Sequence, residues 1–243
     1  MISAYRFQLK SSHGRKILNM SNPIKQFADI DISENVNLAH LVGTLIATPV
    51  YSHSYDDVLY YSARLKVNRN NGSKHDNIHV FLPKTSLVID SKILDTGTRI
   101  KVSGRLVQSE LREMSDVSVV ADEVTLVGDD TKDENQIYIG GVIHRLFELR
   151  SIKDSKRVVK QMILKHTTPT EKGPRNLTIK VSCWNNTGRL VDEKYKEGDK
   201  ILIRGQLGSK IAKSKQVDSS TNRKPTVLLH EATAAVIIDL VND

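Results

Sequence analysis

The chain is poor in cysteine, glycine, proline and aromatic residues, and each shortage excludes a class of protein. The single cysteine, Cys183, has no partner for an intrachain disulfide and cannot build a cysteine-based zinc site. Thirteen glycines and six prolines among 243 residues are too few for a collagen-like or low-complexity chain. Aromatic residues make up 5% of the chain, which argues against a wide aromatic surface.

Long apolar runs are also missing. No stretch reaches the roughly 18 consecutive apolar residues of a membrane span. Residues 1–18 lack the apolar core of about 7–15 residues that marks a secretory signal. We therefore expect a cytoplasmic protein without a membrane partner.

Motifs of enzymes and metal sites are not found in the sequence. It contains no HExxH motif, no Walker loop and no GxGxxG stretch, and its eight histidines are scattered. We expect no enzyme activity, no metal, no cofactor and no small-molecule substrate.

Positive charge is concentrated in the second half of the chain, although the whole chain carries a formal net charge of +8. Residues 1–134 contain 16 Lys and Arg against 17 Asp and Glu, whereas residues 135–243 contain 20 against 11. A basic surface favours anionic partners, above all nucleic acids. We expect the anion-binding surface to lie mostly in the second half, and the first half to serve another purpose, such as assembly or partner binding.

Two segments of the chain repeat at an offset of 101 residues. Residues 96–106 (TGTRIKVSGRL) match residues 197–207 (EGDKILIRGQL), and residues 77–81 (NIHVF) match residues 178–182 (TIKVS). Matches at a common offset indicate a duplicated structural unit.

Apolar and polar residues alternate within both units, which is typical of half-buried strands. Short helical patterns occupy residues 86–94 and 187–195, each before a glycine that can end a helix. Five strands with a helix after the third give the order of the OB-fold, a small barrel. The facing of residues 159–165 stays open. The side chains expected inside the barrels are Ala63, Leu65, Val67, Ile78, Val80, Leu82, Ile100, Val102, Leu106, Leu177, Ile179, Val181 and Cys183.

These patterns predict an all-β chain of tandem five-stranded OB-fold barrels with one short helix per unit. Residues 36–128 form the first domain and residues 136–243 the second. Residues 129–135 between them are expected to be a linker, because like charges repel and resist packing. Residues 1–35 form an N-terminal extension, either an extra strand or an arm.

Short motifs in both halves resemble the bacterial and phage single-stranded DNA-binding proteins. In the second half, Gly198 follows Trp184 at a spacing of 14 positions, as in that family. The resemblance implies OB barrels that bind single-stranded DNA without sequence preference during replication or recombination. It also implies that four barrels assemble into a tetramer. For a chain with two barrels it implies a homodimer. The motifs are VSCWNN at 181–186, YKEGD at 195–199, IRGQL at 203–207, VNR at 67–69, GRL at 104–106 and VADEV at 120–124.

The chain departs from this family at two places that bear on function. Pro83 stands in the first half where the second half has Trp184. Residues 234–243 read as a final strand rather than as a Gly-rich tail with an acidic tip, so partner recruitment through such a tip is not expected. A fused pair of barrels without a tail fits a phage or mobile-element protein.

Trp184 is the strongest candidate for contact with bases. It shares the polar side of its strand with Lys180, so a ring for stacking and a cation for phosphate lie on one face. Stacking of a base on an aromatic ring contributes about 1–3 kcal/mol. The alternative is a shift of the strand register by one residue, which would place Trp184 in the core.

The first half offers weaker candidates. Phe81, two residues before Pro83, is the candidate to replace the missing ring; alternatively, Phe81 is covered by the N-terminal arm or by a partner subunit. Tyr60 shares the polar face of its strand with Arg64 and Lys66, and Arg69 follows that strand.

Two basic runs fall in the loops that flank the ligand face of an OB-fold. One run precedes and begins the second strand of the second unit, and the other lies between its fourth and fifth strands. The alternative for each residue is an ordinary solvated surface. The candidates are Lys153, Lys156, Arg157 and Lys160 in the first run, and Lys210, Lys213, Lys215, Arg223 and Lys224 in the second.

The sequence therefore predicts a non-sequence-specific single-stranded DNA-binding protein that works at nucleoid or replication sites. RNA is not excluded as a ligand, because stacking does not read the 2′-hydroxyl group. The alternative function is an OB-fold protein-interaction module in a replication or virion complex.

Overall fold

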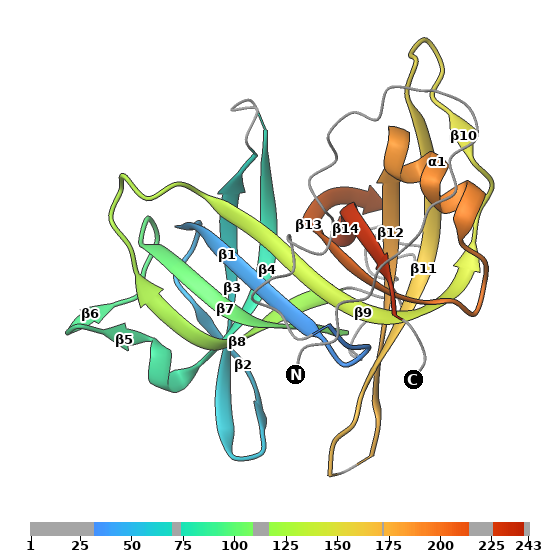
Figure 1. Ribbon diagram of the computed structural model, residues 1–243. Coiled ribbons are helices and arrows are strands. Elements are labelled where there is room, and N and C mark those ends of the chain that lie inside the picture. Colours follow the sequence, from blue (N-terminus) through green and yellow to red (C-terminus); the bar gives the residue numbers. More distant parts are fainter. Residues whose placement is uncertain (1–31, 70–73, 109–116, 172, 214–225, 241–243) are drawn as a thin grey trace, which may run out of the picture.

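The computed structural model describes residues 32–69, 74–108, 117–171, 173–213 and 226–240, and these residues form many strands and one α-helix. Figure 1 shows two barrels beside each other, the first coloured blue to green and the second yellow to red, with β9 passing between them. The candidates Lys215, Arg223 and Lys224 lie outside the described residues, as does most of the N-terminal extension.

Five strands close the first barrel. They neighbour one another in the order β1-β7-β8-β4-β3, and β3 pairs with β1 to close the ring. The pairing of β4 with β8 is parallel, whereas the other pairings in this ring are antiparallel. The strands are β1 (Asn37–Leu45), β3 (Val58–Asn68), β4 (His75–Pro83), β7 (Arg99–Gln108) and β8 (Val117–Leu126).

The second barrel repeats this arrangement. Its order is β9-β13-β14-β12-β11, with β11 pairing back to β9 and with a parallel pairing of β12 and β14. Both units therefore have the strand order of the OB-fold, which confirms the predicted fold class. The strands are β9 (Glu134–Leu146), β11 (Val158–Thr168), β12 (Arg175–Trp184), β13 (Lys200–Lys213) and β14 (Thr226–Asp239).

Each barrel carries additions to the five strands. In the first, β2 (Val50–Tyr55) folds onto β3 as a hairpin. In the second, the short β10 (Arg150–Ser151) pairs with β11, and α1 (Asn185–Lys194) follows β12 at the position where the sequence predicts a helix.

Alternation along the strands fills both barrels with apolar side chains. Every side chain predicted to point inward is buried, with exposed fractions from 0% to 4%. Burying one such aliphatic side chain contributes about 1.5–3 kcal/mol. Met162 and Leu164 are fully buried, so the facing of β11 that the sequence left open is resolved. Burial also raises the pKa of the Cys183 thiol to about 12, as expected for a core residue rather than a reactive one.

Matching bulges show the duplication at the level of single residues. The register of β7 with β8 shifts between Ser103 and Gly104, and that of β13 with β14 shifts between Arg204 and Gly205. A Cβ atom on either glycine would lie about 2 Å from a carbonyl oxygen of the facing strand, 2.1 Å for Gly104 and 2.2 Å for Gly205. Only glycine permits this close approach of two backbones.

The two barrels are joined through their first strands. β1 and β9 pair antiparallel around the Ala39–Ile137 pair, which merges the barrels into one sheet of 12 strands. Asn37 donates to and accepts from the backbone of Leu106, at 2.9 Å each. Asn135 makes the same pair of bonds with Leu207, at 2.8 and 2.9 Å. Each carboxamide thus satisfies a backbone donor and acceptor just as a neighbouring strand would.

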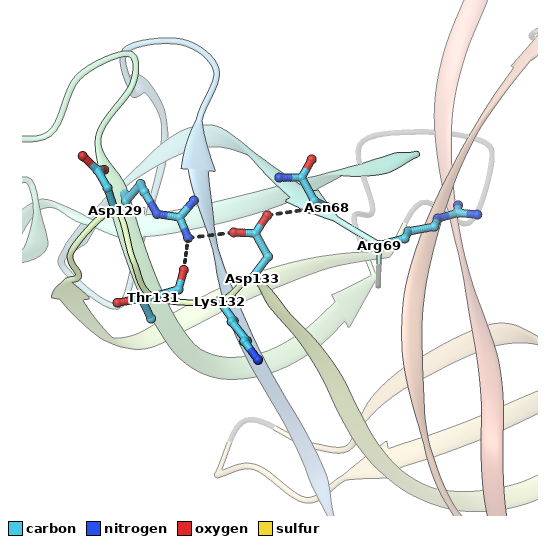
Figure 2. Close-up of a pocket in the computed structure, with 7 residues that line it drawn as sticks. Asn68, Arg69, Asp129, Thr131, Lys132 and Asp133 are labelled. Atoms are coloured by element: carbon cyan, nitrogen blue, oxygen red, sulfur yellow. Dashed lines mark hydrogen bonds and ion pairs between the residues drawn. The ribbon is translucent and has the colours of Figure 1, made fainter. Parts of the chain in front are cut away.

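The acidic residues between the barrels do not resist packing as expected, because Asp133 is bonded to the first barrel. Its carboxylate accepts hydrogen bonds from the Arg99 guanidinium, at 2.7 Å, and from the backbone N–H of Asn68, at 2.7 Å. Figure 2 shows these contacts in a pocket at the junction, together with the bond from Arg99 to the carbonyl oxygen of Thr131. Residues 134 and 135 already belong to β9. A partner of opposite charge thus offsets the repulsion on which the expectation rested.

The helix expected at residues 86–94 is also wrong. A 3-10 turn covers Lys84–Ser86, and β5 (Val88–Ile89) and β6 (Lys92–Ile93) then form a hairpin that projects from the first barrel (Figure 1). Asp90 and Ser91 both have positive φ, 49° and 62°, which matches the two-residue turn preferred in hairpins. The β-branched side chains on either side of this turn favour strand over helix.

Candidate nucleic-acid interface

The strands β11 and β12 present one continuous face outside the second barrel, which we call the outer wall. Cross-strand pairing places Trp184 beside Val159, Ser182 beside Gln161, and Lys180 beside Ile163 on this face. Ser182 and Val159 are buried, with 6% and 4% exposed, and the other residues of these pairs are half-buried. In an OB-fold the corresponding two strands form the ligand face. The outer wall consists of Gln161, Ile163, Lys165, Lys180, Ser182 and Trp184.

Trp184 lies on this outer wall and not in the core. Its neighbour Cys183 is fully buried, whereas Trp184 itself is half-buried, so the predicted strand register is correct. The guanidinium carbon of Arg157 lies 4.4 Å from the centroid of the indole ring. A cation over an aromatic face is attracted by the ring quadrupole, and the pair offers both stacking and charge to a nucleotide.

The loop before β11 carries three exposed cations, one of which, Arg157, contacts this ring. Lys153, Lys156 and Arg157 are all exposed. Asn185, the first residue of α1 and the neighbour of Trp184, accepts a 3.3 Å hydrogen bond from the backbone N–H of Val158. The loop therefore ends against the indole position, where its cations can meet the phosphates of a strand stacked on the ring.

Lys180 and Lys210 lie on the same side of the barrel, and both contact one carboxylate. Glu231 Oε1 is 3.5 Å from Lys180 Nζ and also accepts a hydrogen bond from Lys210 Nζ. Glu231 comes from β14, which pairs with both β12 and β13. The positive charge expected from these two lysines is thus partly neutralised within the protein.

Lys160 is not part of an exposed basic loop, and this expectation is wrong. It occupies an inward position on β11, with only 8% of the residue exposed. Its ammonium group lies 2.6 Å from the carboxylate of Asp192 on α1. A buried ammonium requires such a partner, so this pair fixes the helix against the barrel and leaves no free cation for DNA.

The remaining basic candidates of the second barrel stay predictions. Lys213 ends β13, but its side chain belongs to the undescribed part. Lys215, Arg223 and Lys224 lie between β13 and β14, outside the described residues.

Phe81 in the first barrel is buried, contrary to the expectation that it replaces the missing ring. Only 8% of it is exposed, and the rings of His53 and His79 cover it edge-on at 4.9 and 4.6 Å. His53 belongs to β2, so an additional strand of the same unit covers Phe81. Tyr60 stacks on the same His53 at 5.4 Å between centroids, which occupies one face of the tyrosine ring.

The cations of the first barrel divide into two groups. Arg64 is exposed and Lys66 half-buried, on the same face as Tyr60 as expected. Arg69 is held by the buried carboxylate of Asp76 through two hydrogen bonds of 2.6 and 2.7 Å, and this contact raises the pKa of its guanidinium. Asp76 also accepts a 2.8 Å bond from the backbone N–H of Ser209 in the other barrel. Arg69 therefore supports the junction of the barrels.

Lys165 is a cation of the outer wall that the sequence did not single out. It is exposed and pairs across the sheet with Thr178, which lies four residues before Ser182 on β12. The sequence pattern left the facing of this strand open, and the structure shows three consecutive buried residues, Val158, Val159 and Lys160, at its start.

Within the described residues, no cluster of three or more His, Cys, Asp or Glu side chains is placed to hold a metal ion. This holds also for His75 and His79, which lie four residues apart on β4. The helices of the described part include none with the length and apolar character of a membrane span.

Comparisons with known proteins give one result, at the level of the fold. No family model matches the chain, and no curated protein matches it in sequence. Among solved structures, the wild-type single-stranded DNA-binding protein from Thermus aquaticus matches with a TM-score of 0.63 and 19% identity, over 87% of this chain and 96% of that one. A deletion mutant of that protein gives the same TM-score and identity over 86% and 96%. The chain therefore shares the overall fold of the Thermus aquaticus single-stranded DNA-binding protein.

Proposed function

We propose that the protein binds single-stranded DNA without sequence preference, through the outer wall of the second barrel. The observation that carries the proposal is Trp184, the only tryptophan of the chain, which lies on that wall with the Arg157 guanidinium over its ring. The shared fold with the Thermus aquaticus protein, whose name states that it binds single-stranded DNA, supports the proposal.

The chemistry of the site suits an unpaired strand. A base can stack on the indole because every base has a π-face, and exposed Lys153 and Lys156 in the adjacent loop can attract the phosphates. Neither contact reads the edge of a base, so the mode of binding gives no strong sequence preference. Release of counterions from the phosphates makes such binding weaker as salt is raised.

The proposal extends to cellular role and assembly. Replication and recombination both expose unpaired strands, which are the ligand of a binder without sequence preference. A homodimer would bring four barrels together, as the family resemblance implies, and light scattering at several protein concentrations tests this. The expected phage or mobile-element origin stays a prediction from the sequence.

A titration with labelled oligonucleotides tests the proposal. Fluorescence anisotropy is measured for dT, dA, rU and a duplex of equal length at two salt concentrations. We expect dT and dA to bind, the duplex to bind more weakly, and all affinities to fall with salt. Comparison of rU with dT decides whether RNA is also a ligand. The interaction-module alternative predicts no binding to any of these oligonucleotides, and that result would contradict the proposal.

A further inference from the structure

A second aromatic ring lies at the edge of the outer wall, on the opposite side of β11 from Trp184. Phe147 directly follows β9, and its backbone N–H donates a 2.9 Å hydrogen bond to the carbonyl oxygen of Gln161. Leu146 packs against the barrel core, so alternation turns its neighbours Arg145 and Phe147 outward. Phe147 is half-buried and Arg145 is exposed.

Phe147 has the same kind of partner as Trp184. The guanidinium carbon of Arg145 lies 5.0 Å from the centroid of the Phe147 ring, and that of Arg157 lies 4.4 Å from the centroid of the Trp184 ring. Each ring therefore combines an aromatic face with an adjacent arginine. Stacking and charge together are the two contributions that hold an unpaired strand.

Polar side chains of β10, β11 and β12 contact one another on the same face of the sheet. Gln161 Nε2 donates a 3.1 Å hydrogen bond to Ser182 Oγ, and the guanidinium of Arg150 donates to Gln161 Oε1. Trp184 pairs with Val159, and Gln161 is the next residue of β11 on the same face of the sheet. With strands about 4.8 Å apart and a rise of about 3.4 Å per residue, the two rings are attached about 12 Å from each other.

We propose that Phe147 is a second base-stacking residue and that a bound single strand crosses β11 between Trp184 and Phe147. The guanidinium of Arg150, which donates to Gln161 Oε1 on β11, then meets the backbone phosphates of the crossing strand. This inference rests on the proposed function and adds the path of the strand to it. A phenylalanine that served only the core would turn inward, as Leu146 does.

Moving the tryptophan tests the inference directly. In the double variant Trp184→Phe, Phe147→Trp, the only indole of the chain stands at position 147. We expect dT oligonucleotides to quench its fluorescence as they bind. Unchanged fluorescence while anisotropy shows a bound oligonucleotide would overturn the inference and leave the proposed function intact. If the unsubstituted protein binds no oligonucleotide, the proposed function itself fails.

Affinity measurements provide the second test. We expect Phe147→Leu and Phe147→Ala to weaken dT binding by about 5- to 150-fold, the equivalent of one lost base stack. Phe147→Tyr keeps the aromatic face and is expected to bind as the unsubstituted protein does. Leu190→Ala removes an apolar side chain, 40% exposed on α1, and is the matched control. Since Phe147→Leu retains the apolar volume, binding by this variant at unchanged affinity would contradict the inference.

Discussion

The backbone N–H of Thr178 in the second barrel donates a 2.9 Å hydrogen bond to the side chain of Gln108 in the first. The related contact runs the other way: the N–H of Asn77 donates at 2.9 Å to the hydroxyl of Ser209. Asn77 and Thr178 are 101 residues apart, and so are Gln108 and Ser209. The two barrels therefore meet through contacts related by an approximate two-fold axis, as the subunits of a symmetric dimer do.

This approximate symmetry breaks at Asp76, because the equivalent position in the second barrel is Leu177. Removal of the Asp76 carboxylate should weaken the fold. We expect Asp76→Ala to lower the free energy of unfolding by about 1–3 kcal/mol, because the Ser209 N–H loses its acceptor inside the junction. Urea unfolding measures the change. Asp122→Ala is the matched control, since its ion pair with Arg105 is about half exposed and is worth about 0–1 kcal/mol. Equal losses in both variants would show that Asp76 has no special role.

Glu231 should reduce DNA affinity, because it neutralises Lys180 and Lys210. We expect Glu231→Gln to tighten dT binding by about fivefold, the equivalent of releasing roughly 1 kcal/mol of ion pairing to the phosphates. Anisotropy titration at low salt measures the change. Glu193→Gln removes the same charge from an exposed position on α1 and is expected to have a much smaller effect. Weaker binding by Glu231→Gln would contradict the placement of DNA near these lysines.

Lys153 and Lys156 should contribute to the salt dependence of binding. Each phosphate neutralised on a single strand adds about −0.7 to the slope of log affinity against log salt. We therefore expect the double variant Lys153→Ala, Lys156→Ala to make the slope shallower by about 1.4. The control is Lys92→Ala, Lys101→Ala, which removes two exposed lysines from the first barrel. A slope unchanged by the Lys153 and Lys156 substitutions would remove this loop from the interface.

The fold was largely predictable from the sequence, because alternation and repeated glycines are local signals. Leu65, Val80 and Val181 each point into a barrel as their patterns indicate. The hairpin of β5 and β6 was missed because its short apolar pattern is compatible with a helix as well as with strands. The hairpin turn requires Asp90 and Ser91 to adopt the left-handed conformation. Neither residue type has a strong enough preference for that conformation to reveal the turn from the sequence.

The site was predicted less completely, because its electrostatics depend on residues that are distant in the chain. Trp184 could be found from its strand parity. The cover that His53 places over Phe81 comes from an added strand, and the carboxylate that pairs with Lys180 comes from Glu231. Such partners meet only when the sheet has formed. The same is true of Lys160, whose counterion is on α1.

His166 should make the second barrel sensitive to acid. It is fully buried, its Nδ1–H donates a 2.8 Å hydrogen bond to the carbonyl oxygen of Gly140, and burial lowers its pKa from the usual value of about 6.5. The unfolded chain then binds a proton more readily than the folded one. Its contribution to stability is therefore complete above about pH 6.5 and is lost as the pH falls toward the lowered value.

Urea unfolding at pH 7 and at pH 5 measures this effect. We expect the free energy of unfolding to fall between these values by more in the unsubstituted protein than in His166→Gln, which does not titrate. An equal fall in both proteins would assign the acid sensitivity to other groups.

The central claim is that the indole of Trp184 meets the bases of a single strand, and its own fluorescence tests this most directly. A dT oligonucleotide is titrated at two salt concentrations while the emission of this only tryptophan is followed. The account predicts quenching that saturates, with an apparent affinity that falls when salt is raised. Emission that stays constant while anisotropy shows the oligonucleotide to be bound would place the strand elsewhere and contradict the account.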